Sequence, residues 1–276
     1  MGQITTRGTG DYHDDMEKLL KQIEGNYGTH KSANPVGSLL LSAIRATSKD
    51  LMILPMASYL GQGAKQCRAI EEPKDKLKSA PKGIGGKDRT GLREKWYVGR
   101  QDDPNTDDDD ERYVTHNPDN VAEGGGSNVE LYFTPSEWGG GKSPCSGPGS
   151  SWPADQVLVH ELVHALRDMQ GLTNPVPTTN TSYLNEEEFL AIVVEDVYIS
   201  AKGGTKFRAN HFDDSVLWSP LDTSKGFVEY QDNGKVLDYY ASMWQPFFGQ
   251  LANLTQPKFN PFREVILRKG KPHPVR

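Results

Sequence analysis

The chain has 276 residues, of which 35% are hydrophobic and 25% are charged, and its formal net charge is −6 at pH 7. Its 28 glycines and 18 prolines follow no G-X-Y period, which excludes a collagen and favours a globular protein rich in loops. The acidic balance argues against a nucleic-acid partner. The longest apolar stretches, at 39–44 and 51–60, are shorter than the ~20 residues of a transmembrane helix.

The first residues do not resemble a secretory signal peptide, because acidic residues stand between positions 11 and 15, where a Sec signal is apolar. Any export therefore needs another route. Residues 1–6 fit the short myristoylation pattern at Gly2, although so few loosely specified positions also match by chance. The two cysteines, Cys67 and Cys145, form no CxxC pair and predict free thiols in a reducing cytosol.

Two amphipathic helices and two strands are expected ahead of the functional region. Apolar residues recur at helical spacing over 15–24, and the pattern stops at Gly25. A second helix begins after Asn34, a good capping residue that is followed by a proline suited to the first turn. Residues 51–56 predict a buried strand and residues 129–133 a half-buried one.

A charged segment separates these two strands. Residues 65–100 carry a local charge of +6, whereas residues 101–130 carry −9. We interpret them as solvated loops. The alternation of Asp103, Asn105 and Asp107 leaves a calcium loop open as an alternative, although it lacks the turn glycine and distal glutamate of an EF-hand, and the acidic run at 107–111 could also bind a metal. We expect a single domain over 1–276, with a loop-rich charged insertion around 65–128.

The most informative segment is 151–171, which predicts a helix that ends at Gly171. It contains the motif His160-Glu161-Leu162-Val163-His164. Histidines four residues apart share one helical face and can present two imidazole nitrogens to a single zinc ion. Glu161 can hold a water molecule beside the metal and accept its proton. With 7 histidines in this chain, a random HExxH has a probability of only about 1%.

A catalytic zinc ion needs a third protein ligand and an open position. Residues 185–198 predict a second helix that is acidic at its start and apolar at its centre. We choose Glu188 as the third ligand because it adjoins the apolar run that must pack beside the first helix, and Glu187 is the alternative. Glu195 and Asp168 are candidates for orienting a ligand imidazole through the ring nitrogen that does not bind the metal.

These residues resemble a known family. The blocks His-Glu-Leu-Val-His-Ala-Leu-Arg, Glu-Glu-Phe-Leu-Ala and Arg208-Ala-Asn-His211 are similar to those of bacterial effector zinc metalloproteases delivered by type III secretion. The third block of that family usually ends in tyrosine, and His211 stands at that position. The helix pair is also similar to that of clostridial neurotoxin light chains, where the second glutamate of a Glu-Glu pair binds zinc, which favours Glu188. The resemblance covers about 129–211.

The resemblance implies an α+β, zincin-like fold, in which a small mixed sheet accompanies an HExxH helix and a second helix that carries the glutamate. It implies a zinc-dependent endopeptidase that is secreted without a Sec signal and acts in a host cytosol. Its substrates would be host signalling proteins such as MAP kinases.

In the expected reaction, Glu161 takes a proton from the attacking water and later passes it to the leaving amine. Arg208 and His211 would stabilise the negative charge on the carbonyl oxygen, if the loop that carries them folds over the zinc ion. The alternative for these two residues is a surface position beside a turn at 203–204. Strand 129–133 is expected at the sheet edge, where it would pair with an extended substrate.

Two other functions compete with proteolysis. The chain could be a binding module or an inactive effector that retains the zinc helix for stability, or a zinc hydrolase of a substrate other than a peptide. The aromatic-rich stretch between Tyr239 and Phe248 is a candidate ligand platform, but its spacing is more typical of a hydrophobic core.

Overall fold

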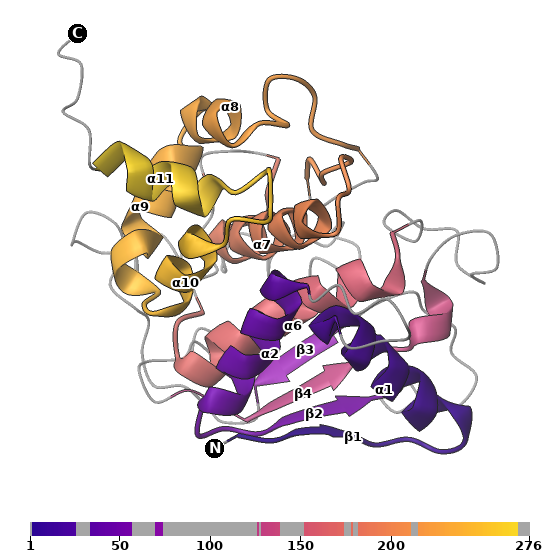
Figure 1. Cartoon of the computed structure of the whole chain (residues 1–276). Helices are drawn as coiled ribbons and strands as arrows, with labels where there is room; N and C mark the ends of the chain where they lie inside the picture. The colour runs from indigo at the N-terminus through magenta and orange to yellow at the C-terminus, as the bar shows by residue number, and fades with distance from the viewer. Residues whose placement is uncertain are drawn as a thin grey trace, which may run out of the picture.

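A computed structural model describes residues 2–25, 34–56, 70–73, 126, 128–138, 152–173, 178, 182–210 and 215–269. These residues form a four-stranded sheet and eight α-helices, a mixed α/β arrangement (Figure 1). Most of the charged insertion, including the acidic run at 107–111, lies outside the described residues, as do both cysteines and His211.

The sheet has the strand order β1-β2-β4-β3. Strands β1 (Ile4–Thr6), β2 (Leu51–Leu54) and β4 (Val129–Tyr132) are parallel, and β3 (Ile70–Pro73) runs antiparallel to β4. Burial alternates along β2 and β4, so that one face of the sheet is buried and the other is half-buried. The buried face supplies Leu51, Ile53, Val129 and Leu131 to the core.

The two predicted strands are present, but the expected edge position of 129–133 is wrong. Strand β4 pairs with β2 on one side and with β3 on the other. The short β3 segment, which lies in the charged insertion, aligns Ile70 with Tyr132 and Pro73 with Val129 and thereby occupies the free side of β4. Among the described strands, β3 is therefore the edge on this side of the sheet.

Both N-terminal helices are confirmed. Helix α1 (Asp11–Glu24) begins four residues earlier than predicted and ends at Gly25, whose φ of 81° suits glycine. Helix α2 (Pro35–Ala46) is capped by Asn34, whose side chain accepts hydrogen bonds from the backbone N–H groups of Val36 and Gly37.

Gly2 lies in a tight backbone contact beside the sheet. Its N–H donates to the carbonyl of Thr47 over 2.6 Å, and a Cβ at this position would lie 2.0 Å from the carbonyl oxygen of Lys49. This close packing is enough to explain why a glycine occupies position 2. Lipidation of Gly2 stays a prediction.

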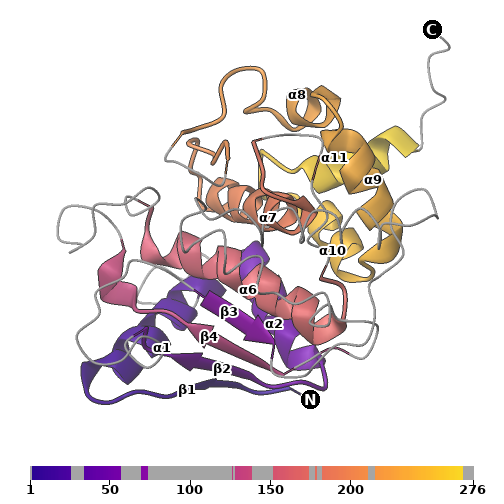
Figure 2. The same ribbon diagram turned by 180° about the vertical axis from the view of Figure 1, so that it is seen from behind.

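The helices are layered over the sheet. Helix α6 (Ala154–Gln170) lies nearest to the sheet, and α7 (Glu186–Ala201) lies beyond it; Figure 1 and the opposite view in Figure 2 agree on this order. Every residue of α7 is buried: α6 and α2 pack against it, and the C-terminal helices contact it through Phe227, which stacks on Phe189, and Tyr240, which donates to Glu186. Functional side chains at the α6–α7 interface are therefore removed from bulk water.

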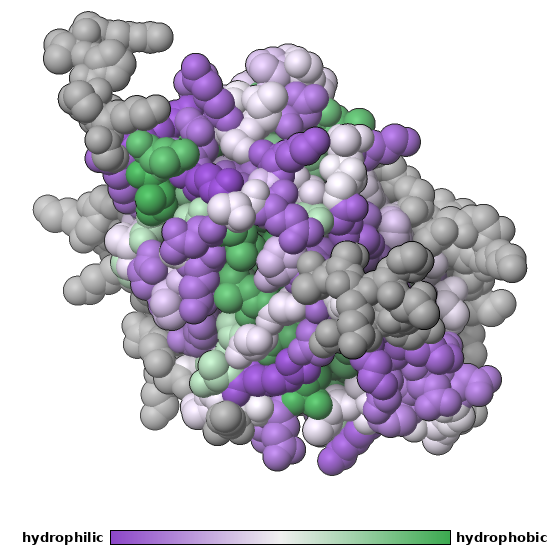
Figure 3. Space-filling model, viewed as in Figure 1, coloured by the Kyte–Doolittle hydropathy of each residue, from purple (hydrophilic) through white to green (hydrophobic). Residues whose placement is uncertain are grey.

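The C-terminal segment forms α8 (Ser224–Glu229), α9 (Asn233–Met243), α10 (Phe247–Asn253) and α11 (Pro261–Lys269). Its aromatic residues are core residues, as the sequence indicated: Tyr240, Trp244, Phe247 and Phe248 are all buried. Figure 3 shows a small apolar cluster over the end of α11, where Ile266 and Leu267 are exposed. Among the described helices, none combines the length and apolarity that a membrane crossing requires.

Replacing Gly37 by Ala tests the packing of α1 against α2. An alanine usually stabilises a helix relative to glycine by about 0.5–1 kcal/mol, but here its Cβ would lie 1.9 Å from the carbonyl oxygen of Ile23. We expect a loss of about 1–3 kcal/mol in the free energy of unfolding, measured by denaturant titration. Ser42→Ala, at an exposed position of the same helix, should be neutral or slightly stabilising. A Gly37→Ala protein more stable than the wild type would show that the two helices are not in this contact.

Candidate metal centre

Helix α6 fixes the HExxH motif on a rigid element. It starts after Pro153 and ends at Gly171, which adopts a left-handed conformation with a φ of 71°. Leu158, Leu162 and Leu166 are fully buried, so the helix cannot rotate without exposing apolar surface. The predicted helix is thus present with the predicted stop signal.

Helix α7 brings the acidic cluster to the same place. Asn185 caps the helix by accepting a hydrogen bond from the backbone N–H of Glu188 over 2.8 Å. Three successive glutamates, Glu186, Glu187 and Glu188, occupy the first turn, where negative charge is favourable beside the positive end of the helix dipole. All three are buried, so each needs a specific partner.

His160, His164 and Glu188 converge on one buried point. The Nε2 atom of His160 lies 3.0 Å from Oε2 of Glu188 and 3.1 Å from Nε2 of His164, and the third side, from Nε2 of His164 to Oε2 of Glu188, is 3.5 Å. The side chains are 3%, 11% and 1% exposed, respectively. This group could hold a metal ion. Of the two glutamates that the sequence left open, Glu188 is the one in the group.

The geometry and chemistry of the three residues fit a tetrahedral metal. Ligand atoms at bond lengths of about 2.0–2.1 Å and tetrahedral angles are separated by about 3.3–3.4 Å, close to the observed 3.0, 3.1 and 3.5 Å. Unprotonated imidazole nitrogens and a carboxylate oxygen all present lone pairs, so a proton or a metal cation must lie among them.

The electrostatics of the centre favour a cation. Burial lowers the pKa of His164, but Glu188 and Glu187 outweigh it and raise that pKa well above its usual value. Burial likewise opposes the shift at His160, whose pKa is raised by Glu188 and Glu195. Positive charge is therefore stabilised on both rings.

Glu195 lies behind His160, as the sequence suggested. Its Oε2 is 3.4 Å from Nδ1 of His160 and 3.3 Å from Nη1 of Arg208. The other candidate, Asp168, accepts a hydrogen bond from the hydroxyl of Thr173. A carboxylate on the second nitrogen fixes the ring orientation of a metal-binding histidine.

Glu187, the alternative ligand, lies behind His164. Its Oε1 is 3.7 Å from Nδ1 of His164 and 2.5 Å from Nε of Arg167. Sequence reasoning missed Arg167, although its place three residues after His164, on nearly the same helical face, was an available signal. Each histidine therefore has a glutamate at its second nitrogen and an arginine beyond that glutamate.

The remaining predicted site residues have different outcomes. Glu161 is half-buried and lies close enough to His164 for its charge to raise the pKa of that ring. Arg208 is buried, which excludes the surface alternative for this residue; its Nε donates to the carbonyl of Asn210 and its backbone N–H to Asp196. His211 lies outside the described residues, so the structure gives no contact for it.

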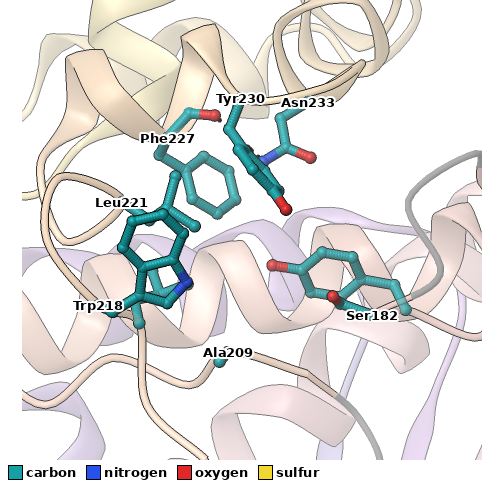
Figure 4. Close-up of a pocket in the computed structure, with 9 residues that line it drawn as sticks. Ser182, Ala209, Trp218, Leu221, Phe227, Tyr230 and Asn233 are labelled. Atoms are coloured by element: carbon teal, nitrogen blue, oxygen red, sulfur yellow. Dashed lines mark hydrogen bonds between the residues drawn. The ribbon is translucent and has the colours of Figure 1, made fainter.

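A small aromatic pocket lies beside the segment that carries Arg208. Figure 4 shows Phe227, Tyr230, Trp218 and Ala209 around it, and its volume is about 70 Å³. Ala209 directly follows Arg208 in the chain. Trp218 is 60% exposed and meets Tyr230 edge-on, with ring centroids 6.4 Å apart. The pocket therefore presents an accessible aromatic wall.

Comparison with known proteins found no family model, no curated protein and no solved structure that matches the chain.

The metal centre is tested by metal-dependent stability. A divalent transition metal present at about 100 times its Kd should raise the free energy of unfolding by about 2.7 kcal/mol, and a chelator should reverse the gain. His164→Ala and Glu188→Gln should lose most of this gain because each removes one of the three converging atoms. Glu264→Gln, on α11 and paired with Arg268, serves as the control. Equal stabilisation of Glu188→Gln and wild type would exclude Glu188 as a ligand.

Proposed function

We propose that this chain is a zinc-dependent endopeptidase. The convergence of His160, His164 and Glu188 at one buried point supports the proposal, because it combines two imidazoles and a carboxylate in the pattern of catalytic zinc sites. The half-buried Glu161 stands one residue after the first histidine on the same helix. Imidazole and carboxylate ligands at tetrahedral separations suit zinc better than the oxygen-rich sets of magnesium or calcium.

When bound, zinc would polarise a peptide carbonyl and acidify a water molecule. Glu161 is the general base that accepts the proton from the attacking water and then donates it to the leaving nitrogen. Glu195 and Glu187 hold the two imidazole rings in orientation. Arg208 pairs with Glu195 over 3.3 Å and so supports the carboxylate beside His160.

The sheet edge supports an extended peptide as the substrate. Strand β3 lies at the edge of the sheet, and α6 packs against it. An added strand would hydrogen bond to β3, so β-strand addition is assigned to β3 in place of β4. The antiparallel edge strand, the HExxH helix and the glutamate-bearing second helix together favour a zincin-like fold.

The motif resemblance also suggests a family, a route of delivery and a class of substrates. We infer that the protein belongs to the bacterial type III effector metalloproteases, reaches a host cytosol without a Sec signal, and cleaves host signalling proteins such as kinases. The resemblance of the motif blocks at 160–167, 187–191 and 208–211 supports this step.

Glu161→Gln tests the proposed function. The variant should lose cleavage by about 10²–10⁴-fold, the usual contribution of a general base, and should keep its metal affinity because Glu161 is not among the converging ligands. The measurement is the mapping of new N-termini in a eukaryotic lysate incubated with each protein. Glu229→Gln, an exposed residue on α8, is the matched control and should cleave as the wild type does.

Two results would contradict this function. Full activity of Glu161→Gln would exclude Glu161 as the base. Tight metal binding by the wild type without new N-termini in native or denatured lysates would instead favour the metal-stabilised binding module.

Trp218→Ala tests whether the aromatic pocket receives a substrate side chain. Loss of the exposed ring should raise KM about tenfold, equivalent to ~1.4 kcal/mol, with a smaller change in kcat because the pocket does not hold the reacting atoms. Leu267→Ala, another exposed apolar residue, is the control and should leave KM unchanged. Equal KM values for Trp218→Ala and wild type would remove the pocket from substrate binding.

A further inference from the structure

The two histidines of the metal centre are supported from different parts of the chain. On the His160 side, Arg208 is held by nearby residues, through the side chain of Asp196 on α7 and the carbonyl of Asn210 in the segment after α7. Behind His164, Arg167 is held by residues more than seventy positions away, on α9 and at its end. The second arrangement connects the C-terminal helices to the centre.

Arg167 is fixed on several sides. It is fully buried, its Nε donates to Glu187 and its Nη2 donates to the carbonyl of Leu172 over 2.6 Å. Its guanidinium carbon lies 4.9 Å from the ring centroid of Tyr240 and 4.8 Å from that of Trp244, both within cation–π range. A buried guanidinium is costly without such partners.

The two aromatic residues are themselves anchored to α6 and α7. Trp244 is fully buried and donates its Nε1–H to Oε1 of Gln170 on α6 over 2.9 Å. Tyr240 donates its hydroxyl to Oε2 of Glu186 on α7, also over 2.9 Å. The end of α9 therefore bridges the two helices that form the metal centre.

These contacts give a different partner to each of three adjacent glutamates. Glu186 accepts from Tyr240, Glu187 is paired with Arg167, and Glu188 faces the two Nε2 atoms. A released Glu187 would be an equally strong carboxylate ligand only one residue from Glu188. The pairing with Arg167 holds Glu187 on the Nδ1 side of His164, away from the metal position.

We propose that Tyr240 and Trp244 position the metal ligand His164 through Arg167 and Glu187, and that this contact assigns Glu188 as the third ligand. The inference rests on the proposed metal centre but does not require proteolysis. These aromatic residues do not touch the metal position; they are positioning residues that act through the guanidinium.

A double-mutant cycle tests the pathway, with zinc affinity measured by competition against a chromophoric chelator. Trp244→Leu and Glu187→Gln should each weaken zinc binding by about 10–100-fold, the usual effect of residues behind a ligand. The double variant should bind no more weakly than Glu187→Gln alone, because Trp244 acts through Glu187. The d–d absorption spectrum of the Co²⁺-loaded protein should change in both single variants.

Matched variants separate positioning from general destabilisation. Trp244→Phe keeps a ring face and should recover most of the zinc affinity. Arg263→Met, a half-buried arginine on α11, should bind zinc as the wild type does. If Trp244→Leu is unfolded by circular dichroism, the same cycle is run with Arg167→Lys, which keeps the charge but loses the planar donor.

The outcomes distinguish this inference from the proposed function. Wild-type zinc affinity and an unchanged Co²⁺ spectrum in Trp244→Leu would overturn the inference, as would equal losses from Trp244→Leu in the presence and absence of Glu187. A wild type that binds no metal would overturn the metal centre itself. Coupled losses of affinity in a protein without proteolytic activity would uphold the inference and reject the endopeptidase.

Discussion

The buried charge between α6 and α7 constrains the whole centre. Three carboxylates, from Glu187, Glu188 and Glu195, lie here against two guanidinium groups, from Arg167 and Arg208. In a low-dielectric environment such an excess of negative charge is unfavourable unless a cation offsets it. Protonated imidazoles or a divalent metal ion can supply that charge, and the separations among the three ligand atoms favour the metal.

The surrounding helices shield these charged side chains from water and fix their positions. Helix α7 is buried along its entire length, which is unusual for a helix with three glutamates in its first turn. It packs against α6 and α2, and Phe227 and Tyr240 of the C-terminal helices contact its first turn. The same C-terminal helices supply Tyr240 and Trp244, so the cover and the orientation of His164 depend on one set of contacts.

Local sequence signals predicted the elements of the centre well. The Asn34 cap, the Gly171 stop and the four-residue spacing of the histidines each depend on backbone geometry within one or two turns, and the structure contains all three features. Glu188 was selected over Glu187 from its place beside the apolar run, and that choice agrees with the geometry.

The features that sequence reasoning missed depend on contacts between distant residues. The central position of β4 results from β3, a four-residue strand in a charged segment without an alternating pattern. The spacing of Tyr240 and Trp244 predicts core residues, but no local pattern indicates that they contact Arg167. The role of Glu187 was equally hidden, since an acidic residue in a first turn is explained by the helix dipole alone.

The contact between Trp244 and Arg167, which are far apart in the chain, determines which fragments of the protein can keep the metal centre intact. A fragment that stops after α7 would contain the complete HExxH motif and Glu188, yet it would lack the rings over Arg167 and the cover of α7. An autonomous unit must therefore include at least the chain up to Trp244, about fifty residues past Glu195. Recombination or truncation within that interval would separate the ligands from the part of the chain that orients them.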